Sequence, residues 1–509
     1  MSEDHHHRRR GRPGGGAAAG PGRAAQTRLR NPFAPQAVLS EDRIAAIHDT
    51  ALRVLEELGL RVLLPEAVAL FRAAGARVEA DGRTVRIGRE IVAAALATAP
   101  GAVRIAARDP GLAVDLAPGA MVFHSGAGCP HVSDRLRGRR PGTLDDFREA
   151  MRLIAGFDAI HLMGAAVEPQ DVAPNLRHYA TTLVQLETSA KVPFVYARGR
   201  AQVQDCFEMI ALSAGETGLD GPRTFTVINT NSPRVLDAPM AEGIIDFARA
   251  GQPAFVTPFC LMGAMAPVTV AGALVLQHAE ALAGITLSQL ARAGAPVLYG
   301  AFASNVAMKS GAPAFGTPEH MRAMLVSGQL ARHIGLPWRG SSGAAANMAD
   351  AQGATETTLA TMAAVMAGAT VTVHAAGWLE GGLTFGFEKF VTDMEVLETL
   401  AALAEPLGAG PEELAFDALA EVAPGGHFFG AAHTMARYRT AFREPLVADW
   451  SNFGQWTEKG ALRADERATE VWRARIAAFA PDPALEENLD AVRAFAARRT
   501  AQGGAAPPG

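Results

Sequence analysis

The sequence predicts a (β/α)₈ barrel, a closed ring of eight parallel strands covered by helices. Eight apolar runs of strand length alternate with helical patterns between residues 121 and 378. The runs are almost continuously apolar, which is typical of parallel strands buried on both faces. Eight such units in a segment of this length suit a closed barrel better than an open sheet. No GxGxxG turn follows any of the runs, which disfavours a dinucleotide-binding fold.

The predicted strands each end in a small or polar residue. They are MVFHSG (121–126), AIHLMGAAV (159–167), PFVYAR (193–198), TFTVINT (224–230), PAFVTPFC (253–260), PVLYGAFAS (296–304), WRGSSG (338–343) and ATVTVHAAGW (369–378). The seventh carries the weakest strand pattern because it is short and rich in glycine. Helical patterns separate them at 143–156, 174–190, 201–214, 237–250, 269–294, 318–334 and 349–367.

Segments outside the barrel are also recognisable. Residues 40–60 show helical periodicity, with Ser40 as N-cap and acidic residues in the first turn. A second helix is predicted at 64–74, followed by a short basic strand pair at 84–87 and 103–107. The expected domains are a disordered arm (1–30), an N-terminal helical extension (31–118), the barrel (119–390), a C-terminal helical segment packed on it (391–499) and a disordered tail (500–509).

Composition narrows the class of protein. Hydrophobic residues make up 49% and charged residues 19% of the 509 positions, enough for a large core. The net charge of −5 gives no indication of the basic surface that nucleic-acid-binding proteins carry. Three widely spaced cysteines (Cys129, Cys206 and Cys260) show no zinc-ligand spacing and favour a reducing cytoplasm. The uncharged stretch 254–276 has bilayer length, but its two prolines favour a buried strand that runs into a buried helix.

Function in such a barrel sits where strands end and loops begin. Polar and aromatic residues at these positions are His124, Ser125, Glu168, Arg198, Asn229, Thr230, Asn231, Phe259, Ser304, Asn305, Ser341, Ser342, His374 and Trp378. The set contains no paired carboxylates of the glycosidase kind and no metal-binding cluster, so no metal is expected. Lys191 and Lys309 fall in loops, which leaves no strand lysine for a Schiff base.

Aromatic rings are the most distinctive feature of the predicted strand ends. The candidate substrate-binding rings are Phe123, Tyr196, Phe259, Tyr299, Phe302 and Trp378. Rings of this kind can enclose a methylated cation that has no hydrogen bond to donate. The alternative is that they fill the layers of the barrel, as bulky side chains generally do.

Three polar residues are the catalytic candidates. His374 ends the last strand before a glycine-rich loop, although a lone histidine on an apolar strand is often a core residue. Asn229, with Asn231 as a substrate-binding neighbour, flanks a predicted turn that explains both equally well. Gln352 follows Asp350 at the start of a helix, where Asp350 also fits a capping role.

Several motifs in one order resemble the trimethylamine methyltransferase family. They are NPFAPQ near residue 31, GSSGAAANMADAQGATETTLATMAAVMAGA (340–369), HAAGWLEGGLTFGFEKFVTDMEVL (374–397), GGHFFGAAHTMARYRTAFREP (425–445) and WTEKGALRADERATEVW (456–472). The resemblance covers roughly residues 31–480. It implies a TIM barrel that moves a methyl group from a methylated amine to the cobalt of a cognate corrinoid protein, a reaction of methanogenesis-type one-carbon metabolism.

The resemblance also bears on the substrate. Some members of the family carry pyrrolysine, and the matching position here lies near Asn347, an ordinary residue. This places the chain in the non-pyrrolysine branch and implies a quaternary amine such as a betaine rather than trimethylamine. Arg198 is a candidate partner for a substrate carboxylate, although a structural ion pair explains it equally well.

The corrinoid (cobalamin) is expected on a partner protein. DAIHLMG (158–164) does not match the Asp-x-His-x-x-Gly pattern of a corrinoid-binding module, because His161 stands three residues after Asp158. Two alternatives stay open: a lyase or hydrolase on the same scaffold, and a non-catalytic protein that binds quaternary amines. The sequence is also compatible with a homo-oligomer.

Overall fold

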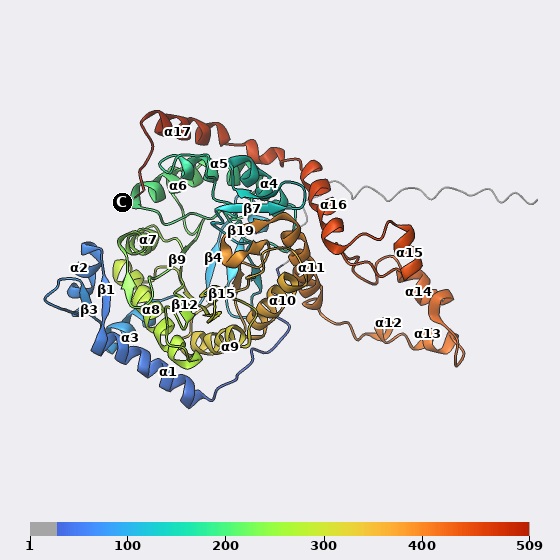
Figure 1. Ribbon diagram of the computed structural model, residues 1–509, viewed down its shortest axis with the longest axis horizontal. Coiled ribbons are helices and arrows are strands. Elements are labelled where there is room, and N and C mark those ends of the chain that lie inside the picture. The colour runs from blue at the N-terminus through green and yellow to red at the C-terminus, as the bar shows by residue number, and fades with distance from the viewer. Residues whose placement is uncertain (1–27, 508–509) are drawn as a thin grey trace, which may run out of the picture.

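The protein is built around a parallel sheet enclosed by helices, as the computed structural model shows for residues 28–507 (Figure 1). The six strands of this sheet, in spatial order, are β6 (Val122–Phe123), β17 (Val371–Val373), β16 (Trp338–Ser341), β13 (Val297–Gly300), β11 (Ala254–Val256) and β9 (Thr226–Ile228). All five neighbouring pairs are parallel. The structure is therefore a mixed α/β fold with a parallel half-barrel sheet.

Two further chain segments lie between the edges of this sheet. Parallel bridges join Phe225 to Phe194, Val192 to Leu162, and Leu162 to His124. The main chain continues the pattern, because Val195 N donates to Phe225 O at 3.1 Å. The predicted strands at 159–167 and 193–198 thus reduce to single bridges rather than ladders.

Helices cover the outside of the sheet between consecutive strands. They are α4 (Leu144–Ala155), α5 (Arg177–Thr188), α6 (Arg200–Ser213), α7 (Ala238–Arg249), α8 (Val270–Ala291), α9 (Pro318–His333), α10 (Ala351–Met366) and α11 (Phe387–Leu403). Side chains cap the N-termini of several of these helices. Thr143 forms a capping box with Asp146 at α4, and Asp350 accepts a hydrogen bond from Gly353 N at α10.

Helix α8 begins within the uncharged stretch 254–276 that raised the possibility of a membrane segment. Among the described residues it is the one helix long and apolar enough to span a bilayer, and 78% of its apolar window is buried inside the protein. The stretch 254–276 forms β11, β12 (Phe259–Met262) and the first turns of α8. A core helix explains this composition.

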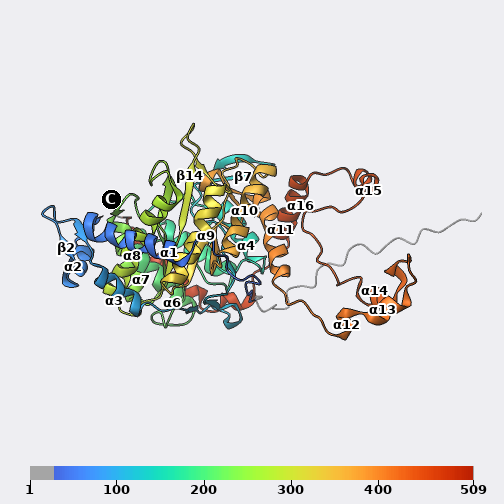
Figure 2. The ribbon, with the colours of Figure 1, turned by 90° about the horizontal axis from the view of Figure 1, so that it is seen from below.

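Short sheets extend beyond the carboxyl ends of the parallel strands. One contains β12, β14 (Phe302–Val306) and β15 (Pro313–Ala314); the other contains β18 (Trp378–Leu379), β19 (Thr384–Gly386), β7 (His131–Asp134) and β8 (Gly138–Pro141). Because β12, β14 and β7 follow core strands directly, these sheets surround the carboxyl end of the barrel-like body, which we call the mouth. Figure 2 shows β14 and β7 at this end and α3 and α6 at the other.

The N-terminal extension contains more strand than the sequence predicted. It consists of α1 (Glu41–Arg53), a π turn η1 (Val54–Leu58), α2 (Pro65–Ala73), α3 (Arg89–Thr98), and the strands β1 (Leu60–Val62), β2 (Arg77–Val78), β3 (Thr84–Arg86), β4 (Val103–Ile105) and β5 (Val114–Leu116). The expected pairing of 84–87 with 103–107 is wrong. β3 pairs with β1 and β2, whereas β4 pairs with β5. β1 also pairs with β10 (Val235–Leu236) after β9, which fixes the extension to the body.

The C-terminal part divides into packed helices and a projecting arm. Its helices are α12 (Pro411–Leu414), α13 (Phe416–Glu421), α14 (Ala432–Arg437), α15 (Phe453–Glu458), α16 (Ala464–Ala477) and α17 (Leu489–Ala501); single 3₁₀ turns are η2 (Pro110–Leu112), η3 (Glu380–Gly382), η4 (Phe428–Gly430) and η5 (Pro483–Glu486). α16 packs on α11, and α17 packs on α5 and α6. Much of 405–460 instead projects from the body (Figure 1), whereas the segment around Val447 is held against α11 and α16. The range 391–499 is therefore not packed throughout.

The two expected disordered termini need correction where the structure describes them. Arg30 forms a bridge with Ala120, so the chain is already paired before residue 31. The tail after α17 is anchored, because Ala505 N donates to Asn175 O at 3.0 Å and Gln202 Nε2 donates to Ala505 O at 2.8 Å. The expectation for residues 1–27 and 508–509 lies outside the described residues.

A buried ion pair holds the loop after β17 against α11. Lys389 Nζ contacts Asp393 Oδ1, and both side chains are at most 2% exposed. Lys389 also donates to Thr357 Oγ1 at 2.6 Å, while Asp393 Oδ2 accepts from Gly377 N at 2.9 Å. Burial raises the pKa of Asp393. The lysine is therefore needed to keep this carboxylate charged and in place beneath the loop.

Removing that lysine should destabilise the fold strongly. We expect Lys389→Met to lower the free energy of unfolding by about 3–5 kcal/mol, because it leaves a buried carboxylate without its cation. Chemical denaturation at neutral pH measures the change. Arg53→Met, which breaks an exposed pair with Glu57, is the matched control and should have no measurable effect. Equal losses in the two variants would contradict the role assigned to Lys389.

Candidate functional site

Three aromatic side chains and one histidine surround Phe302 at the mouth. The centroid of the Phe302 ring lies 4.8 Å from Phe259, 5.5 Å from Phe315, 5.4 Å from His374 and 5.7 Å from Trp378. Parallel pairing of β12 with β14 sets Phe259 beside Phe302 in register. We call Phe259, Phe302, Phe315, His374 and Trp378 the ring cluster. Phe259 and His374 are its part-exposed members.

Trp378 is held in a slot formed by three glycines. A Cβ placed on Gly126, Gly343 or Gly382 would lie 2.8, 2.2 or 2.3 Å from the indole, far inside van der Waals contact. Gly343 and Gly382 also have φ angles of 120° and 103°, which L side chains rarely adopt. The fourth face of the slot is His374, stacked on the indole at 4.0 Å and 11°. These contacts fix the indole plane.

His374 has an unusual backbone conformation at the end of β17. Its φ is 59°, in the left-handed region that costs a non-glycine residue on the order of 1–3 kcal/mol. Its Nε2 accepts a hydrogen bond from Arg339 Nη2 at 3.0 Å, so the neutral ring carries its proton on Nδ1. Nδ1 has no partner in the structure. Burial and the charge of Arg339 hold the pKa of His374 far below its ordinary value, so the ring is neutral at pH 7.

Arg339 places a buried cation beneath the ring cluster. It projects from β16, is 1% exposed, and lies with Cζ 5.2 Å from the Phe302 ring centroid. Its hydrogen-bond partners are the carbonyl oxygen of Ala301 at 3.3 Å and His374, both neutral, while Nε has none. Burial lowers its pKa to about 9, so it is protonated at neutral pH. No carboxylate of the described residues forms a salt bridge with it, which makes it a candidate binding point for an anion.

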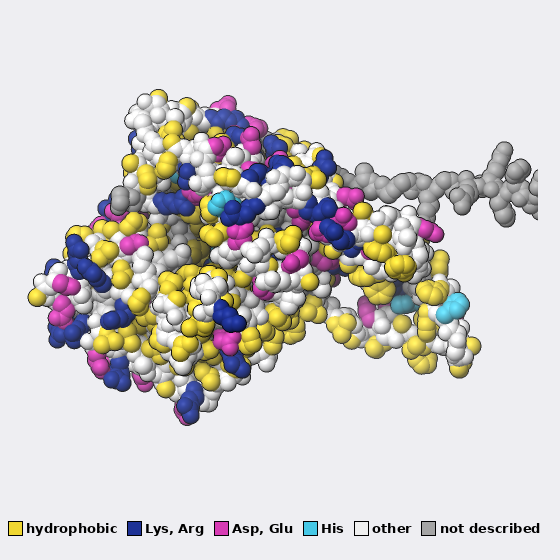
Figure 3. Space-filling view, in the orientation of Figure 1, with side chains coloured by type: hydrophobic (Ala, Val, Ile, Leu, Met, Phe, Trp, Pro, Cys, Tyr) yellow, Lys and Arg dark blue, Asp and Glu magenta, His cyan; other side chains and the backbone are white. Residues whose placement is uncertain are grey.

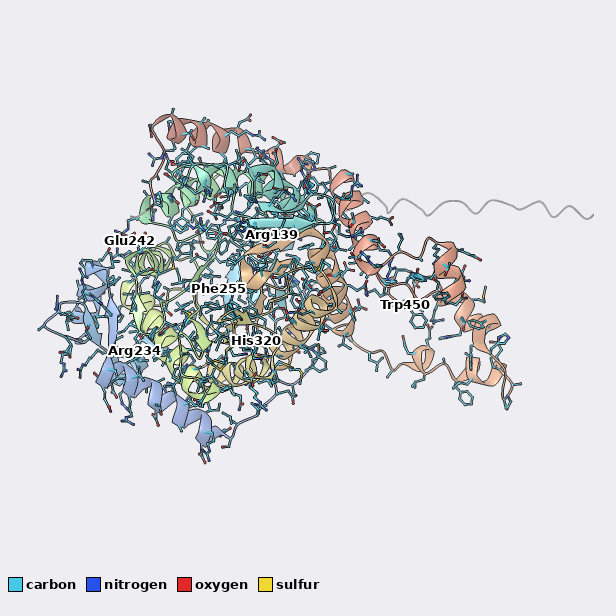
Figure 4. The ribbon with its side chains drawn as sticks, in the orientation of Figure 1. Arg139, Arg234, Glu242, Phe255, His320 and Trp450 are labelled. Carbon is cyan, nitrogen blue, oxygen red and sulfur yellow. The ribbon has the colours of Figure 1, made fainter. Side chains whose placement is uncertain are left out.

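His320 adds a further polar group to this region. It is fully buried on α9, 5.6 Å from Phe315, and burial lowers its pKa to about 4. Its Nδ1 accepts from Gly316 N at 3.2 Å, so the proton is on Nε2, which has no partner. Figure 4 shows His320 and Phe255 near the middle of the ring of helices.

Two predicted rings point away from the cluster. The hydroxyl of Tyr299 lies 3.1 Å from His278 Nδ1 on α8, outside the sheet, because Gly300 rather than Tyr299 shares the register of Arg339. Phe123 packs near His161, whereas the next residue, His124, faces Phe194 and Phe225. Neighbouring strand residues point to opposite faces, so both rings lie on the wrong face for the expected pocket.

Three predicted polar residues also lie apart from the ring cluster. Asn229 is exposed at the end of β9. The Asn231 side chain accepts from Asp237 N at 3.3 Å, as expected for the turn interpretation. Gln352 is exposed on the first turn of α10 and donates to Glu356 Oε1 at 2.8 Å. The side chains of Asn231 and Gln352 are thus engaged outside the ring cluster.

Tyr196 and Arg198 form a separate group at the mouth. Arg198 stacks on Tyr196 at 4.1 Å and pairs with Glu168, which also accepts from Arg177 at 2.5 Å. The Tyr196 hydroxyl donates to Ala165 O at 2.9 Å. Arg198 therefore has a carboxylate partner within the protein, as the structural ion pair requires, and it shares this carboxylate with Arg177.

The structure identifies site residues that sequence reasoning missed: Arg339, Phe315 and His320. A detectable signal existed for Arg339, since WRGSSG places a charged residue inside a strand with no acidic neighbour. Phe315 and His320 reach the site through a loop and a helix, which no strand pattern marks. Figure 3 looks onto the mouth and shows apolar side chains gathered around its hollowed centre.

Sequence comparison links the chain to characterised enzymes. The family model described as trimethylamine methyltransferase (MTTB) matches residues 8–504. A glycine betaine methyltransferase of Desulfitobacterium hafniense is 32% identical over 467 residues, covering 91% of this chain and 97% of the relative. A trimethylamine methyltransferase of the same species is 30% identical over 465 residues, covering 90% and 93%. A trimethylamine methyltransferase of Methanosarcina thermophila is 27% identical over 452 residues, covering 85% and 92%.

Structural comparison gives a matching fold. The crystal structure of the Methanosarcina barkeri monomethylamine methyltransferase superposes with a TM-score of 0.52 at 9% identity. The match covers 90% of this chain and 88% of that one. At this identity the likeness concerns the fold alone.

The buried histidines should make stability depend on pH. Burial and the charge of Arg339 lower the pKa of His124 from 6.5 to about 3. Between pH 6.5 and 3 this histidine is therefore protonated in the unfolded chain and neutral in the folded protein. The free energy of unfolding falls as the pH drops through this range. We expect His124→Leu to reduce the slope of unfolding free energy against pH by about 1.4 kcal/mol per unit between about pH 6 and pH 4. Denaturation series over this range test it, with exposed His427→Gln as control. Parallel curves for wild type and His124→Leu would refute the assignment.

Proposed function

The chain belongs to the trimethylamine methyltransferase family and is a methyltransferase, and we propose that its substrate is a zwitterionic quaternary amine such as glycine betaine. The methyl acceptor in this proposal is the cobalt of a corrinoid carried by a separate protein. Arg339 is the single observation that carries the substrate assignment, because a buried cation without an internal anion requires one from the ligand. A betaine brings both a carboxylate for Arg339 and a cation for the rings.

The ring cluster suits the cationic end of such a substrate. A quaternary ammonium donates no hydrogen bonds and is stabilised by aromatic faces. Phe259 and His374 are the part-exposed rings, and Trp378 and Phe302 lie behind them. Because His374 is neutral, it adds a ring face without charge repulsion. The same histidine holds the Arg339 guanidinium at 3.0 Å, so it links the two recognition elements.

The proposed methyl transfer needs little acid–base catalysis from the protein. When the carbon–nitrogen bond of a quaternary amine breaks, its electron pair stays on nitrogen and leaves a tertiary amine that needs no proton. A corrinoid supplies the cobalt nucleophile that accepts the methyl group. The role of this chain is to hold the methyl group in line and to keep water away from it. Glu168 and Asp393 are engaged in ion pairs, whereas the buried Glu280 accepts hydrogen bonds from Thr230 and Ser232.

The proposal extends to the architecture and the partner. We take the bridges at Leu162, Val192 and Phe194 as the contacts that close the sheet into a (β/α)₈ barrel within residues 119–390. The corrinoid protein then docks on the mouth, whose loops expose the apolar side chains of Leu136, Val268, Met308, Met348 and Leu383. Asn347, at the position where some relatives carry pyrrolysine, is exposed in the loop before α10. We place the enzyme in the cytoplasm with its partner.

Loss of the Arg339 charge should impair betaine recognition. We expect Arg339→Met to lower kcat/KM for glycine betaine roughly 10- to 150-fold, the equivalent of about 1.5–3 kcal/mol for hydrogen bonds to a charged group. The assay follows methylation of free Co(I) cobalamin, or of the cognate corrinoid protein, by absorbance. Arg322→Met on the exposed side of α9 is the matched control and should retain wild-type kinetics. An Arg339→Met enzyme that retains wild-type kcat/KM would overturn the carboxylate assignment.

The substrate panel gives a second test of the same site. Tetramethylammonium and trimethylamine lack the carboxylate, so both should react far more slowly than glycine betaine. Phe259→Leu should raise KM for the betaine about tenfold, because it removes one desolvated cation–π contact. Tyr299→Phe should leave KM unchanged, since its hydroxyl faces α8. Preference for trimethylamine over betaine would show that the proposed substrate class is wrong.

A further inference from the structure

Glu280 of α8 is a buried carboxylate held by three uncharged hydrogen-bond donors. Its side chain is 0% exposed. Thr230 Oγ1 donates to Oε2 at 2.5 Å, Ser232 Oγ donates to the same oxygen at 2.6 Å, and Arg234 N donates to Oε1 at 2.7 Å. Burial raises the pKa of Glu280, and these hydrogen bonds oppose the shift. All three donors belong to one short segment, residues 229–236, which we call the β9 loop.

The β9 loop has a closed shape that its hydrogen bonds maintain. Asn231 N donates to Val235 O at 2.9 Å and Val235 N donates to Asn231 O at 3.2 Å, so the loop turns back on itself. Arg234 has a φ of 58°, in the left-handed region that non-glycine residues rarely adopt. Its carbonyl oxygen accepts from Arg61 N of β1 at 2.9 Å, and its amide donates to Glu280. Figure 4 shows Arg234 beside the N-terminal extension. Glu280 therefore helps to hold the strained residue of the loop.

The β9 loop contacts the strand that carries Phe259. Ser232 Oγ lies 3.2 Å from Cys260 Sγ. Because the Ser232 hydroxyl donates its proton to Glu280, the Cys260 thiol is the donor in this contact. Burial raises the pKa of Cys260, and the charge of Glu280 raises it further, so the thiol keeps its proton. The preceding residue, Phe259, projects from the opposite face of β12 and lies 4.8 Å from Phe302. A hydrogen-bonded path thus joins Glu280 to the residue beside Phe259.

We propose that Glu280 is a positioning residue, which fixes the β9 loop and, through Ser232 and Cys260, the ring of Phe259. This inference rests on the proposed function, in which the part-exposed Phe259 faces the substrate cation. A carboxylate has acceptors only, so it determines the direction in which both loop hydroxyls point. The proposed methyl transfer releases a tertiary amine that needs no proton, so Glu280 has no proton to move in it.

Two substitutions of Glu280 separate positioning from acid–base catalysis. In Glu280→Gln the amide oxygen still accepts from Arg234 N, and the amide nitrogen donates to Thr230 and Ser232, whose hydroxyls rotate away. Its kcat and KM for glycine betaine should stay close to the wild-type values. Glu280→Met removes every acceptor, and KM should rise about three- to tenfold, at most the effect of losing the Phe259 cation–π contact. Methylation of free Co(I) cobalamin measures both constants. A Glu280→Gln enzyme with a wild-type KM and a strongly reduced kcat would show acid–base catalysis and overturn the proposal.

A double-mutant cycle tests whether the effect passes through Phe259. In a Phe259→Leu background, Glu280→Met should raise KM no further, because the ring that it positions is already absent. Equal increases in the two backgrounds would contradict the proposed path. If Glu280→Met does not fold, Ser232→Ala removes one hydroxyl from the path and should show the same lack of additivity. The matched control is Asp246→Asn on α7, a carboxylate that is 5% exposed and pairs with Arg200, and KM should not change.

Hydrogen–deuterium exchange of the full-length protein tests the same contacts without substrate. Amides of residues 230–236 and 260–262 should exchange on the order of tenfold faster in Glu280→Met than in the wild type, and at the wild-type rate in Glu280→Gln. A wild type that does not demethylate glycine betaine would refute the proposed function, and the inference with it. An active wild type whose β9 loop exchanges no faster in Glu280→Met would refute the positioning role alone.

Discussion

The site depends on an uncompensated guanidinium inside the body of the protein. Arg339 is 1% exposed, and its guanidinium donates hydrogen bonds to a carbonyl oxygen and a neutral imidazole. Burying a charge in such a place raises the free energy of the folded state through desolvation, and a fold tolerates this where interactions with a ligand offset it. The neutral state of His374 and the low pKa of His124 both follow from this positive charge and from burial. Burial is the larger cause of both low pKa values, and the charge of Arg339 adds to it.

Backbone geometry fixes the positions of the rings in the site. Trp378 lies where three glycines from separate loops leave room for it, and His374 stacks on it from a left-handed conformation. The Lys389–Asp393 pair holds Gly377, immediately before Trp378, through the main chain. Strain and burial are therefore concentrated in the loop after β17, which α11 stabilises from below.

Much of the fold was predictable from sequence, because apolar periodicity and turn residues mark local structure well. All seven predicted inter-strand helices occur, and even the glycine-rich 338–343 segment forms β16. The site was less predictable. A strand pattern predicts where a residue lies along the barrel axis, but a shift of one residue in the register moves its side chain to the other face of the sheet. Tyr299 therefore faces α8, whereas Arg339 points inward. Phe315 and His320 reach the ring cluster by tertiary folding. The projecting arm within 405–460 has ordinary local helix signals, and its lack of packing is visible only in three dimensions.

The charge of Arg339 also determines how the site responds to its ionic surroundings. A betaine carries no net charge, so binding leaves the total charge of the interior unchanged and exchanges only short-range contacts. Interactions between buried groups are screened weakly by dissolved salt, whereas long-range attraction between net charges is screened strongly. Recognition built in this way is nearly independent of ionic strength. The affinity for the proposed betaine is therefore expected to be similar in dilute and in concentrated media.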